Sequence, residues 1–269
     1  MRAAKAYLHK WEEPCLCVKN GAGTIFFSGC QLNCVYCQNY RISAENYGIE
    51  ITEKRLEKII LSLRDQGADC IELVSGSHYI PQIAKTLESV RLKLDIPVVF
   101  NCGGYEKIQS IEMLYGLVDI FMPDLKYLYS ETSGKYSAAP DYYKYALPAI
   151  EKMCAMTGEC VFDGKQLKKG VIVRHLVLPG HRRESEELLE IMAEKLPRRN
   201  FMISLMSQYT PFYRSVEYPE INRRVSTYEY NKVLAAAKRL GLDGYMQERS
   251  SAKEEYTPDF DLCGLVGDK

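Results

Sequence analysis

The chain has 269 residues with 35 basic and 35 acidic side chains, so its formal net charge is zero. This balance gives no overall attraction for a polyanion, and we expect neither nucleic acid nor a membrane as a partner. Residues 1–14 lack the apolar core of a signal peptide, and no stretch reaches the roughly 18 apolar residues of a membrane span. We therefore expect a cytoplasmic protein whose ten cysteines are reduced.

Hydrophobic periodicity divides the chain into short apolar runs that alternate with segments of helical spacing. We expect residues 1–20 to be an irregular N-terminal extension. The predicted strands cover 24–28, 70–74, 96–100, 119–122, 170–178, 201–206 and 244–247. The predicted helices cover 52–67, 83–94, 108–117, 141–156, 185–196 and 226–240.

This alternation predicts an α/β fold in which right-handed crossovers connect parallel strands. Six or seven strands are too few for a closed eight-stranded barrel, and no second core is visible. We expect one domain over 21–248, preceded by the 1–20 extension and followed by a C-terminal tail over 249–269. The pattern leaves two architectures open, an open partial barrel and a doubly wound sheet.

Three cysteines lie within eight residues directly after the first predicted strand, as Cys30-x-x-x-Cys34-x-x-Cys37. Thiolates this close repel one another unless a cation takes up their charge, which indicates a metal site. A closed zinc site needs four ligands and the loop supplies three. An iron–sulfur cluster on three cysteines would leave one iron open to another ligand. We favour the cluster over zinc or free thiols.

Other polar candidates follow the predicted strands, where sites gather in parallel α/β folds. Arg174 interrupts an apolar strand, and a buried guanidinium needs a partner. The alternative for Asn101 is a turn-forming role without a ligand. The alternative for Asp124 is a surface ion pair with Lys126. The candidates at these strand ends are Ser75, Gly76, Asn101, Asp124, Lys126 and Arg174.

The cysteine spacing, with Tyr36 before the third cysteine, resembles the signature of radical S-adenosylmethionine (SAM) enzymes. The resemblance implies a partial (β/α)6 barrel that holds a [4Fe-4S] cluster on Cys30, Cys34 and Cys37. It also implies SAM on the open iron, Tyr36 near the adenine, and reductive cleavage to a 5′-deoxyadenosyl radical. Flavodoxin or ferredoxin would donate the electron.

Within that superfamily the chain is similar to pyruvate formate-lyase activating enzymes and a related, less characterised group. Asp124-Leu125-Lys126 and the segment around Arg174 resemble parts of the activase SAM site, and Asn101 falls where the activase has an aspartate. The usual Gly-Gly-Glu, which binds the SAM amino group in the activase, is replaced here by Ser75-Gly76-Ser77-His78. After the sixth strand, Gln208 or Tyr209 replaces a histidine.

The resemblance thus implies an enzyme that activates a glycyl-radical enzyme. Alternatives are radical modification of a small molecule or peptide, and a non-catalytic zinc or iron–sulfur module. No catalytic acid or base is identified. We expect the tyrosines after the fourth strand to be mostly packed, with a substrate lid as the alternative. We expect the other outlying cysteines to be buried apolar residues: Cys15, Cys17, Cys154, Cys160 and Cys263.

Overall fold

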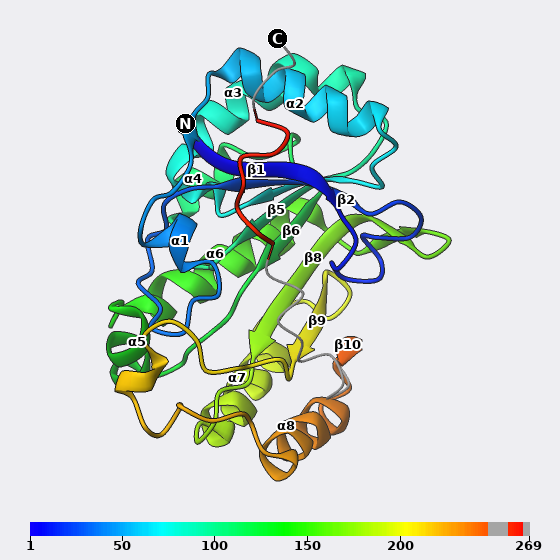
Figure 1. Cartoon of the computed structure of the whole chain (residues 1–269). Helices are drawn as coiled ribbons and strands as arrows, with labels where there is room; N and C mark the ends of the chain where they lie inside the picture. The colour runs from blue at the N-terminus through cyan, green and yellow to red at the C-terminus, as the bar shows by residue number, and fades with distance from the viewer. Residues whose placement is uncertain (247–257, 266–269) are drawn as a thin grey trace.

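The computed structural model describes residues 1–246 and 258–265 and shows one curved sheet with helices packed along it (Figure 1). The strands are β1 (Arg2–His9), β2 (Ala22–Phe27), β3 (Ile49–Glu50), β4 (Ile71–Val74), β5 (Val98–Cys102), β6 (Ile120–Pro123), β7 (Val161–Asp163), β8 (Gln166–Leu176), β9 (Phe201–Met206) and β10 (Gly244–Met246). The α-helices are α1 (Tyr40–Ser43), α2 (Glu53–Asp65), α3 (Ile80–Val90), α4 (Ile108–Glu112), α5 (Ser130–Ser137), α6 (Tyr142–Thr157), α7 (Arg182–Lys195) and α8 (Thr227–Arg239).

The central strands run parallel in the order β2-β4-β5-β6-β8-β9, and β10 extends this series at one edge. A helix connects each strand of the series to the next, which is the repeating unit of a (β/α)6 partial barrel. The predicted architecture is therefore confirmed, and the doubly wound alternative is not needed. The carboxyl ends of all these strands lie along one rim.

Burial explains why these strands are apolar almost throughout. Every residue of β2, β4, β5 and β6 is buried, because helices cover one side of the sheet and the barrel interior lies on the other. Side chains cap the starts of two helices. Thr52 accepts a hydrogen bond from the Arg55 amide at the start of α2, and Ser226 with Glu229 forms a capping box at the start of α8.

The expectation of an irregular segment over 1–20 was wrong for β1. This strand pairs antiparallel with β2, and it also receives the end of the chain, since the Leu262 amide donates to the Ala4 carbonyl. The small residues of β1 gave little strand periodicity, so tertiary pairing decided its conformation. Helix α5 and hairpin strand β7 were not predicted either. Most of the predicted 249–269 tail lies outside the described residues.

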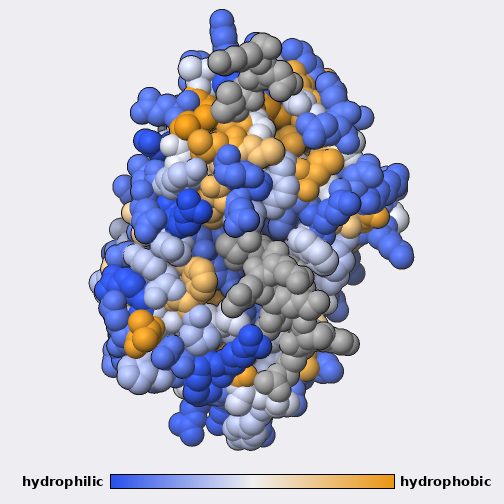
Figure 2. Space-filling model, in the orientation of Figure 1, coloured by the Kyte–Doolittle hydropathy of each residue, from blue (hydrophilic) through white to orange (hydrophobic). Residues whose placement is uncertain are grey.

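The face shown in Figure 2 is largely hydrophilic, with apolar side chains gathered mainly where β1 passes below α2 and α3. Within residues 1–246 and 258–265 the structure contains no helix that is both long and apolar enough to cross a bilayer.

Candidate functional site

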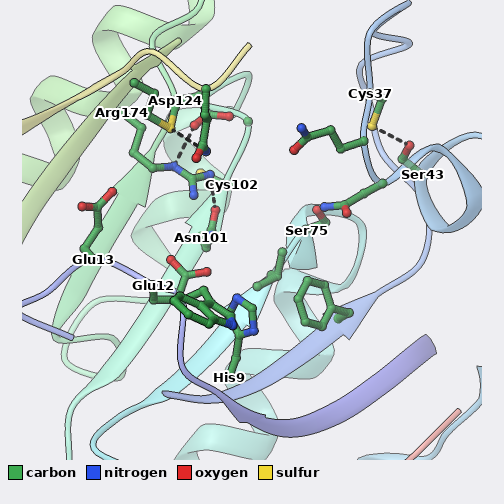
Figure 3. A pocket seen from close by; sticks show the side chains of 18 of the residues that line it. His9, Glu12, Glu13, Cys37, Ser43, Ser75, Asn101, Cys102, Asp124 and Arg174 are labelled. Atoms are coloured by element: carbon green, nitrogen blue, oxygen red, sulfur yellow. Dashed lines mark hydrogen bonds and ion pairs between the residues drawn. The ribbon is translucent and has the colours of Figure 1, made fainter. Parts of the chain in front are cut away.

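One cavity of about 550 Å³ opens at the carboxyl ends of the parallel strands. It brings together most residues that the sequence singled out, although they are far apart in the chain. The predicted residues that line it are Cys30, Cys34, Cys37, Ser75, Asn101, Asp124, Lys126 and Arg174. Figure 3 shows Asn101, Asp124 and Arg174 grouped together, with Cys37 across the cavity from them.

The cysteine loop begins two residues after β2 and is held by hydrogen bonds to its sulfur atoms. The Cys30 sulfur accepts from the Leu32 amide at 3.4 Å. The Cys34 sulfur accepts a hydrogen bond from the Ser137 hydroxyl at 3.0 Å, and the Cys37 sulfur and the Ser43 hydroxyl are hydrogen-bonded to each other at 3.2 Å. Each thiol therefore has a fixed direction.

Burial and mutual repulsion keep these thiols protonated. Burial, and next the neighbouring Cys34, raise the pKa of Cys30 to about 12 and of Cys37 to about 11. Burial also raises the pKa of Cys34, although the nearby Lys126 opposes this effect. Thiols of this kind become thiolates only when a cation replaces their protons.

A buried ion network lies beside the cysteines. Asp124 follows β6, and its carboxylate contacts the Lys126 ammonium at 2.5 Å and the Arg174 guanidinium at 2.9 Å. Arg174 comes from β8 and also donates to the Asn101 side-chain oxygen at 2.7 Å. Burial alone would raise the pKa of Asp124, but these two cations hold it below its usual range. The group presents two cations and one carboxylate to the cavity.

Three further carboxyl groups, Glu12, Glu13 and Glu72, were not singled out from the sequence. Glu72 lies in β4, where it accepts hydrogen bonds from the Thr24 hydroxyl at 2.8 Å and the Asn101 amide at 2.7 Å. Burial raises its pKa. Like Arg174, Glu72 is a charged residue within an apolar strand, and that signal was available in the sequence.

Glu12 and Glu13 enter the same cavity from the segment between β1 and β2 (Figure 3). Glu13 accepts a hydrogen bond from the Ser204 hydroxyl at 2.6 Å. Glu12 is hydrogen-bonded to Glu72, and burial followed by the charge of Glu72 raises the pKa of Glu12 well above its usual range.

Some candidates lie away from the cavity. Tyr36 is 7% exposed, and its hydroxyl lies 2.5 Å from that of Tyr127, so it is not among the lining residues. Gly76 is buried where a Cβ atom would meet Ile83 at 2.6 Å, which indicates a packing role. His78 is exposed and outside the cavity.

The remaining candidates divide between the cavity, the core and the surface. Gln208 lines the cavity, whereas Tyr209 is buried in the core. The expected burial of the outlying cysteines is confirmed for Cys15 and Cys154. Cys17 and Cys160 are only half-buried, and the expectation was wrong for Cys263, which is exposed.

Comparisons with known proteins agree with this geometry. Residues 24–192 match the family model of the radical SAM superfamily. An uncharacterized protein of Methanocaldococcus jannaschii, MJ0674, is 32% identical over 247 residues, which are 88% of this chain and 67% of that protein.

Solved structures share the fold at low sequence identity. SuiB of Streptococcus suis bound to S-adenosylmethionine has a TM-score of 0.51 and 15% identity, covering 81% of this chain and 43% of that protein. The FeFe-hydrogenase maturase HydG of Carboxydothermus hydrogenoformans has a TM-score of 0.56 and 14% identity, covering 85% and 54%. This chain thus spans about half of each of these two proteins. The family match covers more than half of the chain and the fold agrees with it, so the chain belongs to the radical SAM superfamily.

Proposed function

We propose that this protein binds a [4Fe-4S] cluster on Cys30, Cys34 and Cys37 and cleaves SAM reductively beside it. Membership of the superfamily implies an enzyme, and its members typically use this cluster and SAM. The observation that carries the proposal is that the three thiols line the same cavity as the buried network of Asp124 and Arg174.

The thiols fit a cluster better than a single ion. Among the described residues, no three His, Cys, Asp or Glu side chains converge on a position for one metal ion. In a cluster each thiolate binds a different iron, so the sulfur atoms need not share one centre. Three thiolates also leave the fourth iron free for a ligand that the protein does not supply.

The ion network suits a zwitterionic ligand. The ammonium of Lys126 and the guanidinium of Arg174 offer donors to a carboxylate, and the Asp124 carboxylate offers an acceptor to an amino group. Asn101 holds Arg174 in place, and Ser75 lines the same cavity. When bound, the cluster supplies the electron that splits the SAM sulfonium into methionine and a 5′-deoxyadenosyl radical. The side chains bind SAM and keep it oriented.

Two substrate classes are candidates. The activase-like segments around Asp124 and Arg174 favour a glycine of a partner glycyl-radical enzyme. The carboxyl groups of Glu12 and Glu13, which line the cavity, instead favour a small molecule or peptide that carries a basic group. In either case we propose flavodoxin or ferredoxin as the electron donor and the reducing cytoplasm as the location.

The test compares Cys34→Ala with Cys154→Ala, a fully buried cysteine on α6. After anaerobic reconstitution, Cys34→Ala should lose the visible absorption of the cluster and all formation of 5′-deoxyadenosine. Cys154→Ala should keep both. Cluster and 5′-deoxyadenosine in Cys34→Ala would refute the assignment, and a wild-type cluster that never cleaves SAM would support the non-catalytic module. A glycyl EPR doublet in an added glycyl-radical enzyme would decide the substrate class.

A further inference from the structure

Helix α5 is attached directly to the cysteine loop. The Asn33 amide donates to the Ser137 carbonyl at 3.1 Å, and the Val35 amide donates to the Tyr136 carbonyl at 2.9 Å. Ser137, the last residue of the helix, is 1% exposed. These two backbone bonds fix the position of its hydroxyl beside Cys34. The segment after β6 thus contacts the cysteine loop and the Cys34 sulfur, a role that its tyrosine content alone did not indicate.

A chain of hydroxyl groups leads from Tyr36 to Cys34. The Tyr36 hydroxyl lies 2.5 Å from that of Tyr127, which lies 2.7 Å from that of Ser137. The Ser137 hydroxyl donates to the Cys34 sulfur at 3.0 Å. A hydroxyl has one proton to donate, so Ser137 must accept from Tyr127, and Tyr127 from Tyr36. All the hydrogen bonds of this relay therefore point toward the sulfur.

We propose that Ser137, supported by Tyr127 and Tyr36, is a positioning residue that raises the reduction potential of the cluster through Cys34. This inference rests on the proposed function, because it requires a cluster that is bound through Cys34. A thiolate ligand accepts hydrogen bonds more strongly when the cluster gains an electron, so a donor to sulfur favours the reduced state. Because aligned hydroxyls polarise one another, Tyr127 and Tyr36 strengthen the bond that Ser137 makes.

Each of the other two sulfurs also has a hydrogen-bond partner. Cys30 accepts from a backbone amide, which no side-chain substitution can remove, and Cys37 contacts the Ser43 hydroxyl at 3.2 Å. The chain offers a matched control on the same helix as Ser137. Ser133 is also 1% exposed, but its hydroxyl donates to the Ser130 carbonyl at 3.3 Å.

The test is an EPR-monitored redox titration of the reconstituted full-length chain without SAM. Ser137→Ala should shift the midpoint potential to a more negative value. Tyr127→Phe should shift it in the same direction by a smaller amount, because it weakens the bond to sulfur without removing it. Ser133→Ala should keep the wild-type potential. Circular dichroism and iron content would show that each variant is folded and loaded.

Equal potentials in the wild type, Ser137→Ala and Tyr127→Phe would overturn the inference and leave the proposed function standing. If Ser137→Ala fails to hold iron, Tyr127→Phe decides alone, because its ring still fills the same buried space. An equal shift in Ser133→Ala would also overturn the inference, since it would indicate a general effect of disturbing α5. A wild-type chain that takes up no cluster would overturn the proposed function instead.

Discussion

Replacing Asp124 with asparagine should destabilise the protein even without any ligand. The Asp124 carboxylate is 2.5 Å from the Lys126 ammonium and 2.9 Å from the Arg174 guanidinium, and the side chains of these two cations are only 16% and 19% exposed. Removing one partner of a buried ion pair costs about 3–5 kcal/mol, because the other charge stays buried without compensation. We expect the free energy of unfolding to fall by about that amount.

Guanidinium denaturation of the apo protein would measure this change. The control is Glu190→Gln, which breaks the exposed Arg239–Glu190 pair and should cost at most about 1 kcal/mol. The double variant Asp124→Asn/Arg174→Met should lose less stability than the sum of the two single variants. The interaction energy from this double-mutant cycle should be about 0.5–3 kcal/mol. A loss as small as that of Glu190→Gln, or strictly additive effects, would refute the reasoning.

The pH dependence of this difference has a defined sign. The two cations hold the pKa of Asp124 below its usual range in the folded state. Its contribution is therefore complete above the ordinary range of an aspartate and is lost as the pH falls through the folded-state pKa. The gap between the wild type and Asp124→Asn should be full at pH 7 and shrink in acid.

Two further predictions concern the loop after β5. Burial raises the pKa of Glu106 from its ordinary value of 4.5 to about 7. Ionisation of Glu106 therefore opposes folding, and the free energy of unfolding falls as the pH rises from about 4.5 toward 7. Glu106→Gln should remove roughly 2.5 kcal/mol of this decline when unfolding is measured at pH 5 and pH 8, and an unchanged slope would contradict it. Gly104 has a φ of +78°, and a Cβ atom there would meet the Asp124 carbonyl at 2.0 Å, whereas Gly116 has a φ of +74° and open space around it. Gly104→Ala should therefore lower the unfolding free energy by more than about 2 kcal/mol and Gly116→Ala by about 1 kcal/mol; equal losses would refute the steric argument.

The strand ends could be predicted because the fold itself brings them together. Parallel strands end on one rim, so the sequence alone grouped Asn101, Asp124 and Arg174 with the cysteines. A charged residue in an apolar strand was sufficient to single out Arg174, and the same signal applied equally to Glu72. Glu12 and Glu13 gave no such signal, because they lie in the irregular segment between β1 and β2. The course of that segment, which brings them to the cavity, is not encoded by a local pattern.

Tyr36 shows why position in a motif does not define the surroundings of a side chain. The resemblance implies that this aromatic lies near the adenine of SAM, and that role remains a prediction. The structure instead places its ring edge-on to Tyr209, with centroids 5.6 Å apart, and its hydroxyl on Tyr127. The motif fixes only the position of Tyr36 in the sequence, directly before Cys37. Its direction depends on α5, whose backbone bonds to Asn33 and Val35 join segments about a hundred residues apart, and no local pattern in the sequence encodes such contacts.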